Sequence, residues 1–189
     1  NADREPNRPS TMSFSDLIFS ARGQAYCWGN GSLGQHGRNA TIMSDARPSP
    51  DRPAGGSSAY YNGISSSDYL SCGWSNTFST GAGTIDCWGY DPHSLVKDWE
   101  AESIPTSERI LYSPTKVRGW NSGDTLRDKL KAVEVMAMGE QHVCVISNPQ
   151  IKYVVCWGDN TYGQIGGATQ NRVDARDAHF VKVSENDEL

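Results

Sequence analysis

The sequence "CWGNGSLGQHG" runs from Cys27 to Gly37, and "CWGDNTYGQIGG" runs from Cys156 to Gly167. The two stretches share Cys, Trp, Gly, Gly, Gln and Gly at the same offsets, and a third Cys-Trp-Gly step begins at Cys87. Internal similarity of this kind is the signature of a repeat architecture, in which each copy is one small structural unit. We therefore expect one such unit for each copy.

Each copy lies at the end of a pattern that is typical of a β-hairpin. Residues 142–158 contain an apolar alternation, a turn at Asn148-Pro149 and a second apolar run. Residues 70–89 repeat this pattern with a longer glycine-rich turn, and residues 16–29 repeat it with a short one. We expect each hairpin to end in Trp-Gly and to continue into a loop.

The loop positions have separate expected roles. Glycine suits a positive φ angle or a close backbone approach, where a Cβ atom would clash. A glutamine amide can both donate to and accept from loop backbone groups, and an indole can fill the gap between neighbouring sheets. The positions are Gly29, Gly34, Gly37, Gly89, Gly158, Gly163, Gly166, Gln35, Gln164, Trp28, Trp88 and Trp157.

The third copy resembles the repeat of the regulator of chromosome condensation family. The matching residues are Gly139, His142, Trp157, Gly158, Asn160, Gly163, Gln164 and Gly166. The resemblance implies a β-propeller with blades of four antiparallel strands, and a structural place for His142 on an inner strand. The second copy lacks the Gly-Gln-x-Gly segment, and we interpret the sequence that follows Trp88 as an insertion.

We expect an all-β fold, a partial β-propeller of about three four-stranded blades with long loop insertions. The chain is taken as one domain, 1–189, with repeat units at 11–60, 61–113 and 114–183 and an acidic tail at 184–189. Propellers close with about four to eight blades, and unpaired sheet edges invite partners. We therefore expect further blades from another chain or from the rest of a precursor.

A short helix is expected near 124–131, before the strand "VEVMAM". Leu126, Leu130 and Val133 have helical spacing, and Asp124 is a suitable N-cap residue.

Four of the five cysteines occupy equivalent strands of two hairpins. Antiparallel neighbours can bring Cβ atoms close enough for a bridge, so we expect disulfides between Cys72 and Cys87 and between Cys144 and Cys156. Buried thiols are the alternative, but they do not explain the matching places. Secreted relatives with crinkly-type extracellular repeats also carry Cys before Trp-Gly. Cys27 is left over, and two interpretations stay open: a bridge to another chain, or a buried thiol.

Two glycosylation triplets are present, "NGS" at Asn30 and "NAT" at Asn39. They act as acceptors if the chain enters the secretory pathway. Together with the cysteine pattern they favour an extracellular or secretory location.

The composition and motifs argue against several other classes of protein. A net charge of −5 does not suit a nucleic-acid surface, and no apolar run approaches the roughly 20 residues that span a bilayer. The four histidines have no metal-ligand spacing, and no Cys-x-x-Cys occurs. We expect no enzyme activity, no metal and no cofactor. Paired acidic residues, such as Asp86 with Asp91, are interpreted as solvated loop charges.

The first functional hypothesis is a non-catalytic structural or protein-interaction module of a secreted or surface-exposed assembly. The alternative is a carbohydrate-binding propeller, because sugars bind exposed aromatic faces; the candidates are Trp74, Trp99, Trp120, Tyr60 and Tyr61. A third hypothesis follows the family resemblance: exchange of nucleotide on a small GTPase, or inhibition of an enzyme. The expected partners are other protein chains and, in the alternative, glycans.

Overall fold

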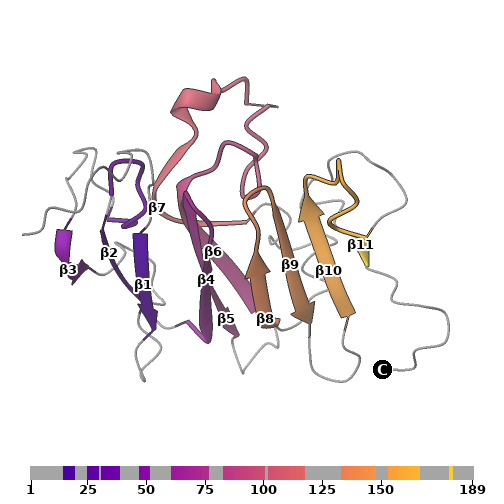
Figure 1. Ribbon diagram of the computed structural model, residues 1–189, viewed down its shortest axis with the longest axis horizontal. Coiled ribbons are helices and arrows are strands. Elements are labelled where there is room, and N and C mark those ends of the chain that lie inside the picture. The colour runs from indigo at the N-terminus through magenta and orange to yellow at the C-terminus, as the bar shows by residue number, and fades with distance from the viewer. Residues whose placement is uncertain are drawn as a thin grey trace, which may run out of the picture.

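The computed structural model describes residues 15–19, 25–29, 31–38, 47–51, 61–76, 83–100, 102–117, 133–147, 153–166 and 179–180. These residues form three antiparallel sheets that lie side by side (Figure 1). Blade 1 consists of β1 (Ser15–Phe19), β2 (Ala25–Gly29) and β3 (Arg47–Asp51). Blade 2 consists of β4 (Gly63–Ser66), β5 (Leu70–Asn76), β6 (Gly83–Tyr90) and β7 (Ile110–Lys116). Blade 3 consists of β8 (Val133–Met138), β9 (His142–Ser147), β10 (Tyr153–Gly158) and β11 (His179–Phe180). The expected all-β partial propeller is confirmed.

The three expected hairpins pair in the same register. The pairs that include the cysteine of each Cys-Trp-Gly step are Leu17 with Cys27, Cys72 with Cys87, and Cys144 with Cys156. In blades 1 and 2 the next strand pairs with an irregularity at the same place, between Cys27 and Gly29 and between Cys87 and Gly89. The repeat in the sequence is therefore a repeat in backbone geometry.

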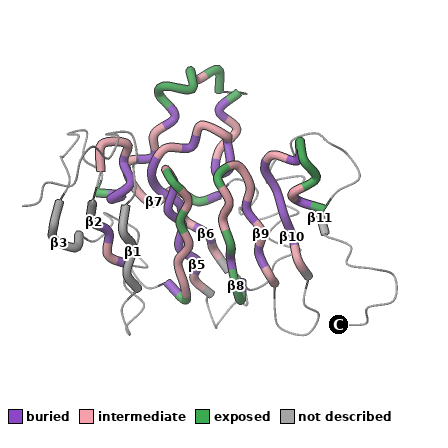
Figure 2. Tube along the Cα trace, in the orientation of Figure 1, coloured by how far each residue is buried: buried purple, intermediate pink, exposed green. Residues whose placement is uncertain are grey.

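The sheets pack face to face, and buried apolar residues lie in the two seams between them. A small cluster between blades 1 and 2 contains Ala25, Cys27, Tyr61 and Trp88. A larger core between blades 2 and 3 includes Leu70, Cys72, Trp74, Ile85, Cys87, Met136, Val143, Val145, Val155 and Trp157. Trp88 and Trp157 thus hold equivalent places, each packed toward the sheet that precedes its own. Figure 2 shows buried segments gathered where blades 2 and 3 adjoin.

The insertion after β6 forms a protrusion at the top of Figure 1, which we define as residues 91–109. It contains a short 3-10 helix, η1 (Thr106–Glu108), and then leads into β7. The expected helix at 124–131 lies outside the described residues. Val133, which shares its spacing, begins β8 instead and is buried, because it adds to the core between blades 2 and 3.

Candidate functional site

The features that repeat among the described residues are loops and the seams between sheets. The described residues contain no group of three His, Cys, Asp or Glu side chains that could hold a metal ion. Within the same part of the chain, no helix has the length and apolarity needed to cross a bilayer. The informative features are the loops after the Cys-Trp-Gly steps and the seams between blades.

The loops after β2 and β10 are built by the same hydrogen bonds. Leu33 N donates to Gln35 Oε1 at 2.8 Å, and Tyr162 N donates to Gln164 Oε1 at 2.8 Å. Each loop also has a backbone turn that ends on a glycine of positive φ, +79° at Gly34 and +77° at Gly163. Because that region of φ suits glycine, both loops need glycine there.

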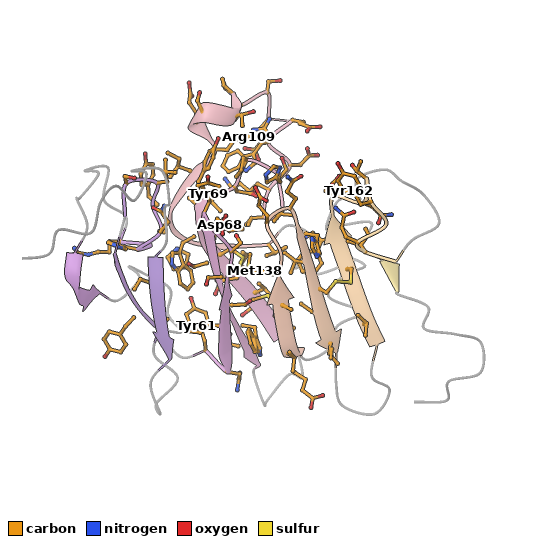
Figure 3. All side chains as sticks on the ribbon, viewed as in Figure 1. Tyr61, Asp68, Tyr69, Arg109, Met138 and Tyr162 are labelled. Atoms are coloured by element: carbon orange, nitrogen blue, oxygen red, sulfur yellow. A yellow bond between two sulfur atoms is a disulfide. The ribbon has the colours of Figure 1, made fainter. Side chains whose placement is uncertain are left out.

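These two loops share this framework but have different surroundings. A Cβ atom on Gly34 would lie 2.9 Å from Ile110 Cγ2 and 3.0 Å from Leu111 O, so the blade 1 loop packs against β7 of blade 2. Gly163 has no neighbour of this kind within 4 Å. Tyr162 is 90% exposed, and it stands clear of the sheets in Figure 3. The blade 3 loop therefore has the same conformation as its blade 1 counterpart without the contact that covers it.

The protrusion replaces this loop in blade 2 and is organised by a buried carboxylate. Asp91 is 1% exposed and accepts from Leu95 N at 2.7 Å, Val96 N at 3.0 Å and Trp99 Nε1 at 2.9 Å. Burial raises the pKa of Asp91, and the hydrogen bonds from these groups oppose that rise. The interpretation of Asp91 as a solvated loop charge is wrong, because its oxygens are consumed inside the fold.

Arg109 closes the base of the protrusion (Figure 3). Its Nε donates to Ile104 O at 3.1 Å, and its Nη1 donates to Pro92 O at 3.1 Å and to Ser94 Oγ at 3.3 Å. Neither Arg109 nor Asp91 was expected to have this role. The Asp91-Pro92 dipeptide was the available signal, since Asp before Pro favours the start of a turn.

The protrusion also reaches blade 3. Leu95 O accepts from Trp157 Nε1 at 2.9 Å, so the indole of the third Cys-Trp-Gly step is held by the blade before it. Gly158, at φ +112°, lies against Gln141 O and Leu95 Cδ2, which leaves no room for a Cβ atom. The seam therefore combines apolar packing with a directed hydrogen bond.

Other predicted repeat residues have packing roles of the same kind. Gly139 lies beneath the His142 ring, which fills the space a Cβ would take, and Gly89 has φ +113° against Tyr69 O. Asn160 Oδ1 accepts from Ile165 N at 3.1 Å inside the blade 3 loop. The Trp28 side chain, Asn30 and Asn39 lie outside the described residues.

The cysteines fall into two groups. Cys72 bonds to Cys87 and Cys144 bonds to Cys156, each pair joining neighbouring strands of one hairpin. Cys27 takes part in neither disulfide and is 0% exposed, in the cluster between blades 1 and 2. A sulfur in that position cannot reach another chain unless the seam opens.

Tyr61 lies across the same seam as Cys27. Its ring centroid is 5.9 Å from that of Trp88, and its ring covers Gly73. Burial raises the pKa of Tyr61, and the charges of Asp86 and Cys27 raise it further.

The aromatic residues named for sugar binding are not available as a surface. Trp74, Trp99 and Tyr61 are all buried, because Trp74 and Trp99 pack into the larger core and Tyr61 into the smaller one. Trp120 and Tyr60 lie outside the described residues. For the three aromatics that can be located, the expectation of an exposed aromatic face is wrong.

No protein-family model matches the sequence. Among solved structures, Prp20p from Saccharomyces cerevisiae superposes with a TM-score of 0.60 at 15% identity, over 90% of this chain and 36% of that one. Human WBSCR16 gives 0.58 at 19% identity, over 89% and 37%. Yeast RCC1 (Prp20) bound to Kap60 gives 0.57 at 15% identity, over 90% and 35%. The chain thus spans about a third of the length of the structures it matches. These superpositions show the fold of the chain, which is part of an RCC1-type β-propeller.

Proposed function

We propose that this chain is a non-catalytic structural or protein-interaction module, a single partial propeller domain completed by further blades. Those blades come from another chain or from the rest of a precursor. The observation that carries the proposal is the contrast between the loops after β2 and β10. Their hydrogen bonds match, yet one is covered by the next blade and the other leaves Tyr162 and Gly163 exposed.

Protein partners are the ligands that best agree with the fold and with the charge. Prp20p has been described with binding properties toward Gsp1p and histones, and yeast RCC1 has been solved bound to Kap60. These are properties of those proteins, and they support protein binding as a use of this kind of propeller. The net charge of −5 makes a nucleic acid the less suitable partner.

An extracellular or secretory location is part of the proposal. Disulfides form and persist in oxidising compartments, and each of blades 2 and 3 has one disulfide across its central strands. Asn30 and Asn39 are the glycosylation positions that such a location would make available. The chain would then be a secreted, Cys-Trp-Gly variant of the repeat.

Native mass spectrometry of the protein isolated from its source tests the proposal. We expect a complex with at least one protein and, after denaturation without reductant, a mass that rises by four hydrogens when reductant is added. A lone chain that captures no protein contradicts the interaction role. An unchanged mass on reduction contradicts the secretory location.

A further inference from the structure

The seam between blades 1 and 2 contains two buried polar side chains that lie side by side. Ser71 on β5 pairs with Trp88 on β6, and both residues are 0% exposed. Directly paired residues project from the same side of a sheet, so these side chains are neighbours. Trp88 packs with Ala25 and Cys27, which places the pair on the side of blade 2 that faces blade 1.

Both side chains carry a polar atom that needs a partner. Neither Ser71 Oγ nor Trp88 Nε1 has a hydrogen-bond partner in the part of the chain that the structure describes. Buried polar atoms in folded proteins are nearly always bonded to another protein group or to an ordered water. Two such atoms on neighbouring strands therefore indicate one shared partner.

The matching pair in blade 3 shows how the repeat solves this problem elsewhere. Trp157 holds the place of Trp88, and it pairs with Val143, which holds the place of Ser71. Trp157 Nε1 donates to Leu95 O at 2.9 Å, in the loop of the preceding blade. Valine has no polar side-chain atom, so this pair leaves nothing unsatisfied in the seam between blades 2 and 3.

The seam between blades 1 and 2 differs from that arrangement at two adjacent places. Gln35 follows Cys27 at the same spacing as Leu95 follows Cys87, so the Gln35 carbonyl is the expected acceptor for Trp88. Trp88 Nε1 does not bond to it or to any other described group. The residue beside this indole is also a serine instead of a valine, so a hydroxyl is gained where the direct acceptor is lost. This combination is the one expected if a small polar molecule takes the place of the direct bond.

The chemistry of the two atoms suits a water molecule. An indole Nε1 only donates, whereas a hydroxyl both donates and accepts. A water that accepts from Trp88 Nε1 can donate to Ser71 Oγ, and it then satisfies both atoms. A buried water needs polar partners and sufficient room. Because serine is smaller than valine, the same pairing leaves more room beside Trp88 than beside Trp157.

We propose that the seam between blades 1 and 2 holds an internal water molecule that bridges Trp88 Nε1 and Ser71 Oγ. This water does for blades 1 and 2 what the carbonyl of Leu95 does for blades 2 and 3. The two seams then join their indoles to the neighbouring structure by different means, one through water and one directly.

Nuclear magnetic resonance of the oxidised chain, isotope-labelled at its tryptophan indole nitrogens, tests this inference. The readout is magnetisation transfer from water to each indole N–H, recorded in the laboratory and rotating frames so that bound water is distinguished from proton exchange. Trp157 is the internal control, because its N–H donates to a protein carbonyl. Ser71→Val removes the hydroxyl and fills its surroundings as Val143 does in blade 3. Ser107→Val is the matched control, because it makes the same change at an exposed residue of the protrusion.

We expect a signal from long-lived water at the Trp88 indole and none at Trp157. The Trp88 signal should be lost in Ser71→Val and unchanged in Ser107→Val, with circular dichroism and thermal unfolding confirming that both variants are folded. The inference is overturned if wild-type Trp88 gives no such signal, if Ser71→Val leaves the signal unchanged, or if Trp157 gives an equal one.

A crystal structure of the wild-type chain gives a second readout that needs no variant. A water oxygen within about 3.2 Å of both Trp88 Nε1 and Ser71 Oγ supports the inference. A structure without that oxygen, or with a protein group in its place, overturns it.

Discussion

Replacing Asp91 by alanine should destabilise the whole protein although Asp91 lies in an insertion. Its carboxylate is the acceptor for three buried donors: Leu95 N, Val96 N and Trp99 Nε1. Leu95 in turn receives the hydrogen bond from Trp157 Nε1. Loss of the carboxylate therefore loosens both the protrusion and the seam between blades 2 and 3.

The size of the effect follows from opposing contributions. A buried donor left without an acceptor lowers the free energy of unfolding by about 1–3 kcal/mol. Three such donors together would give a loss at the upper end of the range known for single substitutions. Removing the carboxylate also relieves its desolvation, which is the reason that burial raises the pKa of Asp91. Water can also enter the space left by the side chain. We expect a net loss of about 3 kcal/mol for Asp91→Ala and about 2 kcal/mol for Asp91→Asn, which keeps one acceptor oxygen.

Urea unfolding followed by tryptophan fluorescence measures these losses. For a chain of this length, a loss of about 3 kcal/mol corresponds to a fall of about 6–12 °C in the melting temperature. Glu102→Ala is the control within the same insertion, since Glu102 is exposed, and it should change stability by less than about 0.5 kcal/mol. If Asp91→Ala also stays within about 0.5 kcal/mol, the carboxylate does not organise the protrusion and the argument is refuted.

Three further predictions concern the seams. Burial raises the pKa of Asp86 above its ordinary value of 3.8, and the charge of Lys116 opposes this rise. The folded state therefore binds the proton of Asp86 more tightly than the unfolded state does. As a result, the contribution of Asp86 to stability falls as the pH rises from 3.8 through the folded pKa. The stability of Asp86→Asn relative to wild type should therefore increase as the pH rises from 3.8 through the folded pKa, and a difference independent of pH would contradict this. The Cys27 thiol should react with a maleimide only after unfolding, because it is buried; rapid labelling of the native, oxidised chain would place it at the surface. Gly163→Ala should lower the free energy of unfolding by about 1 kcal/mol, because its positive φ alone disfavours a side chain. Gly34→Ala should lower it by about 2–3 kcal/mol, because the added Cβ also meets Ile110 and Leu111 O. Equal losses in urea unfolding would show that the blade 1 loop does not pack on β7.

Much of the fold could be predicted from the sequence, since the repeat carries its own periodicity. The Cys-Trp-Gly steps marked β2, β6 and β10, and the apolar alternation before each one marked the hairpin partner. A hairpin is a local structure, so its signal lies within a few residues of sequence. The same reasoning explains why cysteines at matching hairpin positions could be paired.

The organisation of the protrusion could not be predicted in the same way. In the sequence Asp91 looks like one more loop carboxylate, and only the folded chain shows that four donors converge on it. Trp74 and Trp99 are similarly ambiguous, because an indole suits both a sugar-binding surface and a seam between sheets. Their burial depends on contacts between residues far apart in the chain, which no local pattern encodes.

The loops after β2 and β10 separate what the sequence determines from what the neighbour determines. Gln35 and Gln164 accept the same hydrogen bond at the same distance, so the loop conformation belongs to the repeat itself. The burial of Gly34 comes from its contact with β7 of blade 2, and that contact has no counterpart at Gly163 among the described residues. The same loop is thus covered in one copy and exposed in the other, so its burial is decided by the neighbouring strand and not by the loop sequence.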